Sequence, residues 1–143
     1  MDQDKAEALA EFLSVSVDEV EPMPYGDVFE AGGGEYEVLT DSEADEKARA
    51  YILDSLWAFN TDFIMDHLAK PVTGRAYDAL EASIKHAQGA MCEDANELIA
   101  TLIGDNINEF IDDAISADGR GHFLTTYDGE ENEQGEYFIY RVN

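Results

Sequence analysis

Carboxylates are the most plentiful chemically active side chains in this chain, which has 33 aspartates and glutamates. Residues 128–132, with the sequence DGEEN, begin like a calcium-binding loop. An EF-hand loop needs Gly at its sixth position and Glu at its twelfth, but those positions hold Glu133 and Ile139. We therefore interpret the segment as a solvated turn. Carboxylate pairs are so common here that they do not specifically indicate acid–base catalysis.

Histidine and cysteine offer no recognisable metal or nucleophile motif. His67, His86, His122 and Cys92 lack the short spacings that bring zinc ligands together. Two acidic residues follow Cys92 and disfavour its thiolate, so we expect a small, buried, unreactive side chain. Residues 32–34 are three glycines that precede a predicted strand, so they lack the geometry for phosphate binding at a helix start. The sequence predicts no metal, no cofactor and no enzymatic activity.

The net charge of −25 is distributed unevenly along the chain. Residues 1–50 hold fifteen acidic and three basic residues (net −12), residues 51–92 hold five and three (net −2), and residues 93–143 hold thirteen and two (net −11). A charge of this size opposes compaction, and its usual causes are a basic partner, a salty solvent or a disordered tail. Since 45% of residues are hydrophobic and 10% aromatic, we expect one folded domain over residues 1–143.

Composition also excludes several classes of partner. The chain has eight lysines and arginines, too few to neutralise phosphates, so direct nucleic-acid binding is disfavoured. No stretch approaches the roughly 20 apolar residues of a membrane span, and residues 1–5 are acidic where a secretory signal would be basic. An anionic surface is repelled by anionic lipid, which disfavours membrane binding. Cys92 is the only cysteine and forms no internal disulfide, which fits a reducing, intracellular setting. We expect a cytoplasmic protein that does not bind membranes.

Hydrophobic periodicity predicts helices through much of the chain, with no internal repeat. Thr40 and Glu43 match a capping box at the start of one of them, and Ser16 is placed to cap a short turn. Gly104 interrupts the last helix, so two shorter helices are the alternative to one long helix. The predicted helices cover residues 4–13, 41–58, 61–68 (with Thr61 as its cap), 74–88 and 91–117.

Two hairpins are predicted at the two ends of the chain. Residues 28–30 and 36–39 flank the glycine turn, while 122–127 and 137–142 are β-branched and aromatic and flank a polar segment at 128–135. Isolated hairpins are marginal in water, so we expect both to join one antiparallel sheet covered by helices. The predicted fold is α+β, and its core is the nearly neutral helical middle of the chain.

The acidic segments could bind a basic protein in place of a nucleic acid. Duplex DNA carries one charge per ~3.4 Å of axis on each strand, so a helical stripe with carboxylates roughly 5 to 6 Å apart is too sparse alone. Two acidic elements must lie side by side. The candidates are Glu97, Asp105, Glu109, Asp112 and Asp113 on the last helix, Asp128, Glu130, Glu131 and Glu133 in the loop, and Asp41, Glu43, Asp45 and Glu46 at the start of the 41–58 helix.

The last helix and the loop rank first among these candidates, because acids in the first turn of a helix are also explained by the helix dipole. Two segments, LTDSEADEKA at 39–48 and GRGHFLTTYDGEE at 119–131, resemble small acidic proteins of bacteriophages and their hosts, which have no assigned activity. The resemblance covers about two-thirds of the chain and carries over no catalytic or binding residue. It implies a phage or bacterial origin and a role against restriction enzymes or CRISPR effectors. Similarity to phage DNA mimics such as anti-restriction proteins is in charge and size only.

The predicted function is inhibition of a bacterial host protein by a monomer or homodimer that occupies its basic nucleic-acid-binding surface. One alternative is a solvent-adapted, halophile-like acidic domain, which the scarcity of lysine favours and the uneven charge distribution disfavours. The other alternative is an adaptor that binds protein without imitating nucleic acid.

Overall fold

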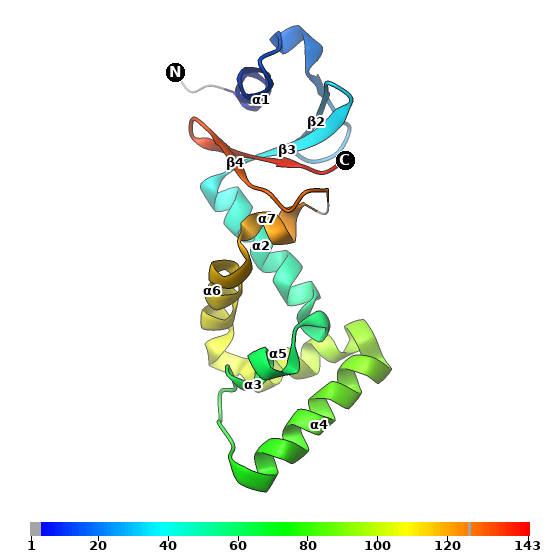
Figure 1. Cartoon of the computed structure of the whole chain (residues 1–143), viewed down its shortest axis with the longest axis vertical. Helices are drawn as coiled ribbons and strands as arrows, with labels where there is room; N and C mark the ends of the chain where they lie inside the picture. Colours follow the sequence, from blue (N-terminus) through cyan, green and yellow to red (C-terminus); the bar gives the residue numbers. More distant parts are fainter. Residues whose placement is uncertain (1–3, 126) are drawn as a thin grey trace. The chain divides into compact units, whose positions relative to one another are not determined.

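The computed structural model describes residues 4–125 and 127–143 and has an α+β fold, as predicted (Figure 1). The chain divides into two compact units. Unit 1 comprises residues 1–48 and 118–143, and unit 2 comprises residues 49–117. The prediction of a single domain stays a prediction. No helix within the described residues is both long and apolar enough to cross a bilayer.

The strands of unit 1 form one antiparallel sheet in the order β1-β2-β3-β5-β4. The predicted first hairpin is confirmed, because β2 and β3 are joined by Gly32 and Gly33, both at positive φ. Pairing of β3 with β5 places the N-terminal and C-terminal acidic segments in the same sheet. The strand bounds are β1 (Glu21–Pro22), β2 (Val28–Ala31), β3 (Gly34–Thr40), β4 (Asn132–Gln134) and β5 (Tyr137–Arg141).

Three helix starts in unit 1 use local side-chain caps, and those at Ser16 and at Thr40 with Glu43 were predicted from the sequence. The side chain of Asp4 caps α1 (Lys5–Leu13), and Ser16 with Glu19 forms a capping box on the 3₁₀ turn η1 (Val17–Glu19). The predicted box before α2 (Asp41–Asp54) is present. The Thr40 N–H donates to Glu43 Oε1 at 2.9 Å, and the Glu43 N–H donates to Thr40 Oγ1 at 3.3 Å.

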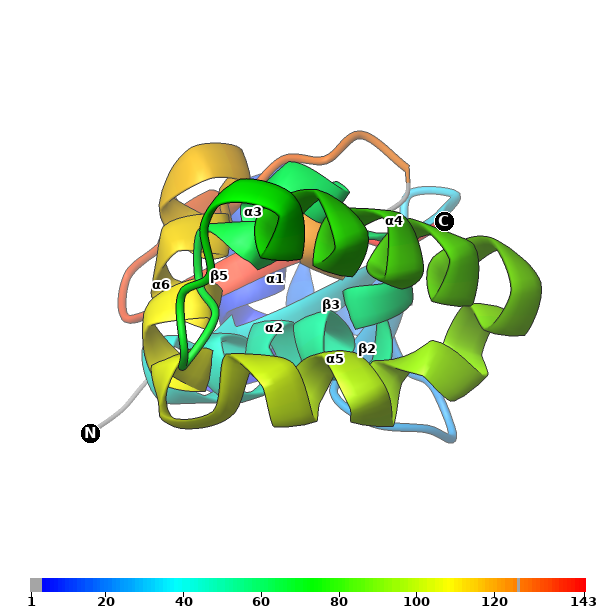
Figure 2. The same cartoon turned by 90° about the horizontal axis from the view of Figure 1, so that it is seen from below.

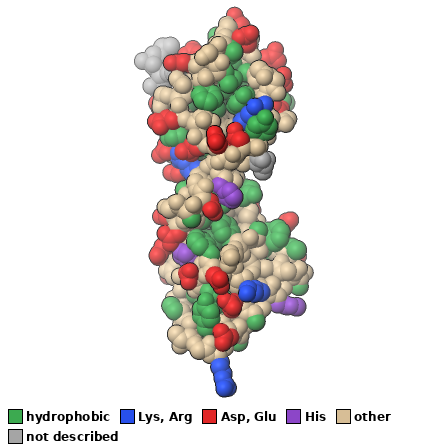
Figure 3. Space-filling view, in the orientation of Figure 1, with side chains coloured by type: hydrophobic (Ala, Val, Ile, Leu, Met, Phe, Trp, Pro, Cys, Tyr) green, Lys and Arg blue, Asp and Glu red, His purple; other side chains and the backbone are tan. Residues whose placement is uncertain are grey.

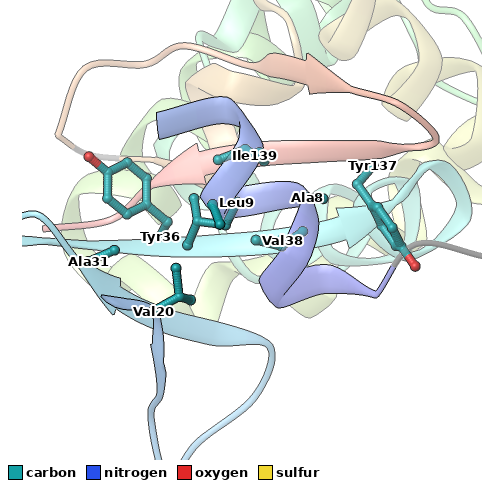
Figure 4. Close-up of a cluster of buried hydrophobic side chains, with 9 residues drawn as sticks. Ala8, Leu9, Val20, Ala31, Tyr36, Val38, Tyr137 and Ile139 are labelled. Atoms are coloured by element: carbon teal, nitrogen blue, oxygen red, sulfur yellow. The ribbon is translucent and has the colours of Figure 1, made fainter. Parts of the chain in front are cut away.

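The sheet of unit 1 buries side chains on both faces. On one face, Ala8 and Leu9 of α1 pack over Val38 of β3 and Ile139 of β5 (Figure 4). On the other face, Leu39 and Tyr140 pack with Ala44 of α2 and Leu124 of α7 (Arg120–Leu124). Burial of a large apolar side chain contributes about 1.5–3 kcal/mol, so both helix layers stabilise the sheet.

The predicted strand at 122–127 is wrong. Residues 120–124 form α7, Thr126 lies outside the described residues, and β5 pairs with β4 from the segment predicted to be a turn. Gly121 packs so closely on the backbone of 129–131 that any side chain there would collide with it. Preference for strands depends mainly on packing, so the β-branched and aromatic composition of 122–127 did not determine its backbone.

Unit 2 contains the remaining helices. The segment predicted as one helix at 41–58 ends at Asp54, and the helix predicted at 61–68 ends at Met65 with Asn60 as its cap, in place of Thr61. The predicted helix at 74–88 is confirmed and continues to Met91. The helices of unit 2 are α3 (Thr61–Met65), α4 (Gly74–Met91), α5 (Asn96–Ile103) and α6 (Ile107–Asp118), with 3₁₀ turns η2 (Leu56–Ala58), η3 (Cys92–Ala95) and η4 (Gly104–Asn106).

The prediction of one long helix at 91–117 is wrong, and the two-helix alternative is confirmed. Gly104 takes φ 54° and ψ −126°, and the chain turns there between α5 and α6 (Figure 2). Cys92 takes nearly the same conformation, φ 50° and ψ −124°, between α4 and η3. Each of these residues is the first residue of a 3₁₀ turn that leads into a helix.

The matching turns correspond to an internal repeat that the sequence analysis missed. Residues 91–103 (MCEDANELIATLI) align with residues 103–115 (IGDNINEFIDDAI) without a gap. Asn, Glu and Ile recur at 96–97–99 and 108–109–111. The expectation of no repeat is therefore wrong, and the helical spacing of hydrophobic residues on both sides of Gly104 hid the break.

Two further expectations about burial are wrong. Cys92 is exposed, because it forms the turn itself. The core is also not confined to the neutral middle, since Leu9, Val38 and Tyr140 of the acidic ends are as fully buried as Ile84 of α4. Acidic and apolar residues alternate along β3, so one strand supplies both core and charged surface.

Candidate partner-binding surfaces

Arg120 gathers three of the predicted partner-binding carboxylates in unit 1. Its Nη1 donates to Asp41 Oδ1 at 2.8 Å and to Asp45 Oδ1 at 2.9 Å, and its Nε donates to Glu131 Oε1 at 2.8 Å. Asp41 and Asp45 lie one turn apart on α2, whereas Glu131 lies just before β4. These four residues, the Arg120 cluster, are therefore an internal ion-pair network as well as part of the acidic surface.

The cation of the Arg120 cluster is permanent, because an arginine stays protonated at every relevant pH. Its side chain is only 10% exposed, and its guanidinium lies 4.6 Å from the ring centre of Phe138. Burial opposes the charge, but the hydrogen bonds to Glu131 and Asp41 outweigh it, so the pKa of Arg120 is above its ordinary value. Burial and the hydrogen bond from its hydroxyl to Glu131 raise the pKa of Tyr140, which therefore remains a protonated donor.

Two lysines engage other acidic residues of unit 1. Lys5 Nζ lies 2.7 Å from Glu43 Oε1 and 3.1 Å from Asp27 Oδ1, and Lys47 pairs with Glu37. The hydrogen bond from Lys5, with that from the Thr40 N–H, lowers the pKa of Glu43 to about 2. Glu43 thus joins α1 to the start of α2, which gives this predicted binding residue a structural role.

Arg141 is the fourth basic residue of unit 1, and it lies on aromatic rings. Its guanidinium carbon is 4.1 Å from the ring centre of Tyr127 and 5.7 Å from that of Tyr36, and its Nε donates to the Asn143 carbonyl. All four lysines and arginines of unit 1 are therefore engaged within the fold. Four basic residues cannot neutralise the 21 acidic residues of the unit, so unit 1 keeps a large net negative charge.

A row of glutamates crosses three neighbouring strands of the sheet. Glu21 of β1 is directly opposite Glu30 of β2, which is directly opposite Glu35 of β3. We call these three residues the glutamate row. Cross-strand side chains start about 4.5–5.5 Å apart, and like charges at that spacing destabilise a sheet. Among the described residues, no lysine or arginine forms an ion pair with the row.

Two neighbouring polar side chains donate hydrogen bonds to the glutamate row, and its negative charge raises the pKa of one of them. Tyr25, which is exposed, donates its hydroxyl to Glu35 Oε1 at 3.1 Å, and Asn143 Nδ2 donates to Glu35 Oε2 at 3.1 Å. The hydrogen bond to Glu35 raises the pKa of Tyr25, and the charges of Glu35 and Glu30 add to this effect. The row therefore combines charge with an aromatic hydroxyl at one end of the sheet.

The other predicted binding residues of unit 1 are exposed. Glu46 lies on α2 and Glu133 on β4, and Asp128 Oδ1 accepts a hydrogen bond from the Glu130 N–H at 3.0 Å. This local bond is typical of a turn stabilised by an aspartate. Across the face drawn in Figure 3, carboxylates appear at many points and lysines and arginines at few.

The predicted acidic stripe of unit 2 is divided among three elements. Glu97 lies on α5, Asp105 on η4, and Glu109, Asp112 and Asp113 on α6. Asp113 Oδ2 lies 2.7 Å from Nε2 of His67, so it has an internal partner. The turn at Gly104 means that these residues do not form the single stripe predicted from a continuous helix. The first-ranked combination, this stripe with the loop at 128–133, draws on both units.

Sequence reasoning missed the glutamate row, the cations Arg120 and Lys5, and His67. The Glu30–Glu35 pair of the row could have been found, because a two-residue turn at Gly32-Gly33 fixes which residues face each other in this hairpin, whereas Glu21 lies on β1, outside it. Arg120 could not, because its partner Asp41 is 79 residues away. Contacts of this kind follow from the pairing of β3 with β5, which no local pattern specifies.

Nothing in the described residues gathers three His, Cys, Asp or Glu side chains in an arrangement that could hold a metal ion. Comparison with protein-family models, with curated proteins and with solved structures gives no match.

Proposed function

We propose that this chain is an acidic inhibitor that binds the basic, nucleic-acid-binding surface of another protein and excludes nucleic acid from it. The observation that supports this proposal best is the charge inventory of unit 1. The unit has 21 acidic and four basic residues, and all four basic residues are engaged internally. Its excess carboxylates, the glutamate row included, are left for an external cation.

The glutamate row supports the proposal because it places like charges opposite one another with no internal cation to neutralise them. Three like charges on neighbouring strands repel one another, and a glutamine or threonine at Glu30 would fit the same exposed position. A basic partner would turn this repulsion into attraction on binding. Residues kept at the expense of stability are typical of functional surfaces.

Binding of this kind depends on charge density more than on duplex geometry. Side chains of the row are spaced about as widely as carboxylates along one face of a helix, so the row alone is too sparse to reproduce duplex DNA. The exposed Glu46, Asp128, Glu130 and Glu133 add charge to the same unit. Electrostatic complementarity of this type accelerates association and weakens as salt rises.

Competition with labelled DNA tests the proposal. The resemblance to small acidic phage proteins makes bacterial restriction enzymes and CRISPR effectors the first proteins to assay. Fluorescence anisotropy should show the chain displacing a labelled duplex from at least one of them. Direct binding of the chain to the same protein, measured without DNA, should weaken strongly between about 50 mM and 200 mM salt, as expected for a ligand that replaces phosphates.

A matched pair of triple variants tests which surface acts. Glu21→Gln/Glu30→Gln/Glu35→Gln removes three charges from the row, and Glu97→Gln/Glu109→Gln/Asp112→Asn removes three exposed charges from unit 2. We expect the row variant to lose at least about tenfold in affinity, equivalent to 1.4 kcal/mol, and the unit 2 variant to lose less. Equal losses would contradict a specific role for unit 1.

The alternatives give different outcomes in the same experiments. Salt-insensitive capture of a partner through apolar contacts would indicate an adaptor, and loss of the fold below molar salt would indicate a halophile-like acidic domain. Circular dichroism of the purified chain at low and high salt separates the second alternative from the proposal.

A further inference from the structure

His67 of unit 2 is a buried histidine with two hydrogen-bond acceptors. The residue follows α3 and is 8% exposed, with its ring 4.7 Å from that of Phe63 and 5.2 Å from that of Phe110, measured between centres. Its Nδ1 lies 2.8 Å from the Phe63 carbonyl oxygen, and its Nε2 lies 2.7 Å from Asp113 Oδ2 on α6. Both distances are those of strong hydrogen bonds.

The chemistry of the two acceptors determines the protonation of the ring. A backbone carbonyl only accepts, so Nδ1 must carry a proton. An ionised carboxylate also only accepts, so Nε2 must carry one too. A neutral imidazole has one N–H and satisfies one of the two acceptors, whereas the imidazolium ion satisfies both.

We propose that His67 is a proton-dependent latch in unit 2, which holds the end of α3 to α6 through both ring nitrogens when it is protonated and loses one of these bonds when it is neutral. The latch differs from a catalytic His–Asp pair because neither ring nitrogen is left to accept a proton from a substrate. Its role is conformational.

Charged groups on α6 favour the closed latch. Asp113 and Glu109 face the ring from α6, Asp66 precedes it in the chain, and Asn106 of η4 contributes a neutral amide that donates to the His67 carbonyl. Burial lowers the pKa of His67, but the hydrogen bonds to Phe63 and Asp113 and the charges of Asp113 and Glu109 outweigh burial, so the net pKa is raised.

The direction of this shift fixes the pH at which the latch opens. A histidine whose pKa is raised on folding stabilises the fold fully at pH values below its pKa in the unfolded chain, which is about 6.5. This stabilisation is lost as pH rises through its pKa in the folded chain. The latch is therefore closed in mildly acidic solution and opens on the alkaline side. Opening leaves Asp113, whose side chain is 52% exposed, as an unneutralised charge beside Glu109 and Asp112.

Proton NMR titration of the histidine rings tests the proposal directly. We expect the His67 signal to titrate at a higher pH in the folded chain than in the same chain unfolded in urea. A second titration uses three variants that each remove one negative charge from α6: Asp113→Asn, Glu109→Gln and Asp112→Asn. The fall in the His67 midpoint should be largest for Asp113→Asn, smaller for Glu109→Gln, and smallest for Asp112→Asn, the matched control.

Thermal unfolding from about pH 5 to 8, where an ordinary histidine titrates, gives the conformational readout. The wild-type melting temperature should fall across this range relative to His67→Gln, and the two should converge at the alkaline end. If His67→Gln does not fold, the variant titrations decide alone. A folded midpoint at or below the unfolded one, or equal effects of Asp113→Asn and Asp112→Asn, would overturn the latch.

Discussion

Each unit of the protein contains a buried cation that joins distant segments, but the two cations differ in kind. Arg120 of unit 1 binds Asp41, Asp45 and Glu131 and stays charged at every relevant pH. His67 of unit 2 binds Asp113 and one carbonyl and loses its charge as pH rises through its raised pKa. An acidic protein can therefore stabilise its strongly charged unit at every pH while the stability of its less charged unit follows pH.

Among these variants, Arg120→Ala should reduce the free energy of unfolding the most. It leaves three carboxylates close together without a cation, and breaking a buried ion pair costs about 3–5 kcal/mol. Because Asp41 and Asp45 are mostly exposed, we expect a smaller loss of about 2–4 kcal/mol in the free energy of unfolding, measured by urea denaturation. Arg120→Lys should recover only part of it, since lysine lacks the planar fork. A loss no greater than that of Arg75→Ala, at an exposed position, would contradict the role of the cluster.

Glu43→Gln tests whether the ionic contact between Lys5 and Glu43 in unit 1 is lost at low pH. Because folding lowers the pKa of Glu43, the ionised side chain stabilises the fold fully at pH values above the ordinary glutamate pKa. This stabilisation is lost as pH falls toward the folded pKa of about 2. Its side chain is 39% exposed, so after allowance for solvent screening we expect a loss of about 1–2 kcal/mol at pH 7. Glutamine also serves in a capping box, so the variant isolates the contact with Lys5.

The pH dependence of Glu43→Gln is its internal control. Urea denaturation of wild type and variant should converge as the solution is acidified toward the folded pKa of Glu43, because the wild-type carboxyl then becomes neutral too. A constant difference between the two proteins over this range would mean that the charge of Glu43 is not what stabilises the contact.

His67→Gln should reproduce this pattern in unit 2 with the opposite pH direction. Loss of a charge-assisted hydrogen bond costs about 1–2 kcal/mol at pH 5, and the difference from wild type should shrink as pH rises to 8. The effect of Arg120→Ala should stay constant over the same range, because arginine does not titrate there. If the loss of unfolding free energy followed pH in the same way for both variants, His67 would not act as a titratable cation in contrast to Arg120.

Local signals in the sequence predicted much of unit 1, whereas tertiary contacts decided the rest. The capping box at Thr40 and Glu43 and the turn at Gly32-Gly33 depend on residues a few positions apart, so both were predictable. The helix at 120–124 was not, because its backbone is set by packing of Gly121 on residues 129–131 and by burial of Phe123. The composition there favours a strand, and tertiary packing overrides it.

The sequence predicted the acidic residues of the candidate surface but not the basic residues that pair with them. Acidic residues could be named from the sequence, but their neutralisation could not, since Arg120, Lys5 and His67 reach partners 79, 38 and 46 residues away. The break at Gly104 was foreseen only as an alternative. Its counterpart at Cys92, a non-glycine residue at positive φ, carries no signal by residue type, and only the alignment of 91–103 with 103–115 reveals it.

Glu30→Gln has the smallest expected effect and the opposite sign. Glu30 is the middle residue of the glutamate row, so its replacement removes two like-charge contacts and should stabilise the chain by about 0.2–1 kcal/mol at low salt. The gain should shrink as salt screens the repulsion. Glu133→Gln is the matched control, because Glu133 is an exposed strand residue opposite Phe138 and has no glutamate across from it. If both variants change the urea midpoint equally, the row is not a site of repulsion. If Glu30→Gln alone stabilises the chain and also weakens DNA displacement, unit 1 keeps this repulsion at the cost of stability because a partner relieves it.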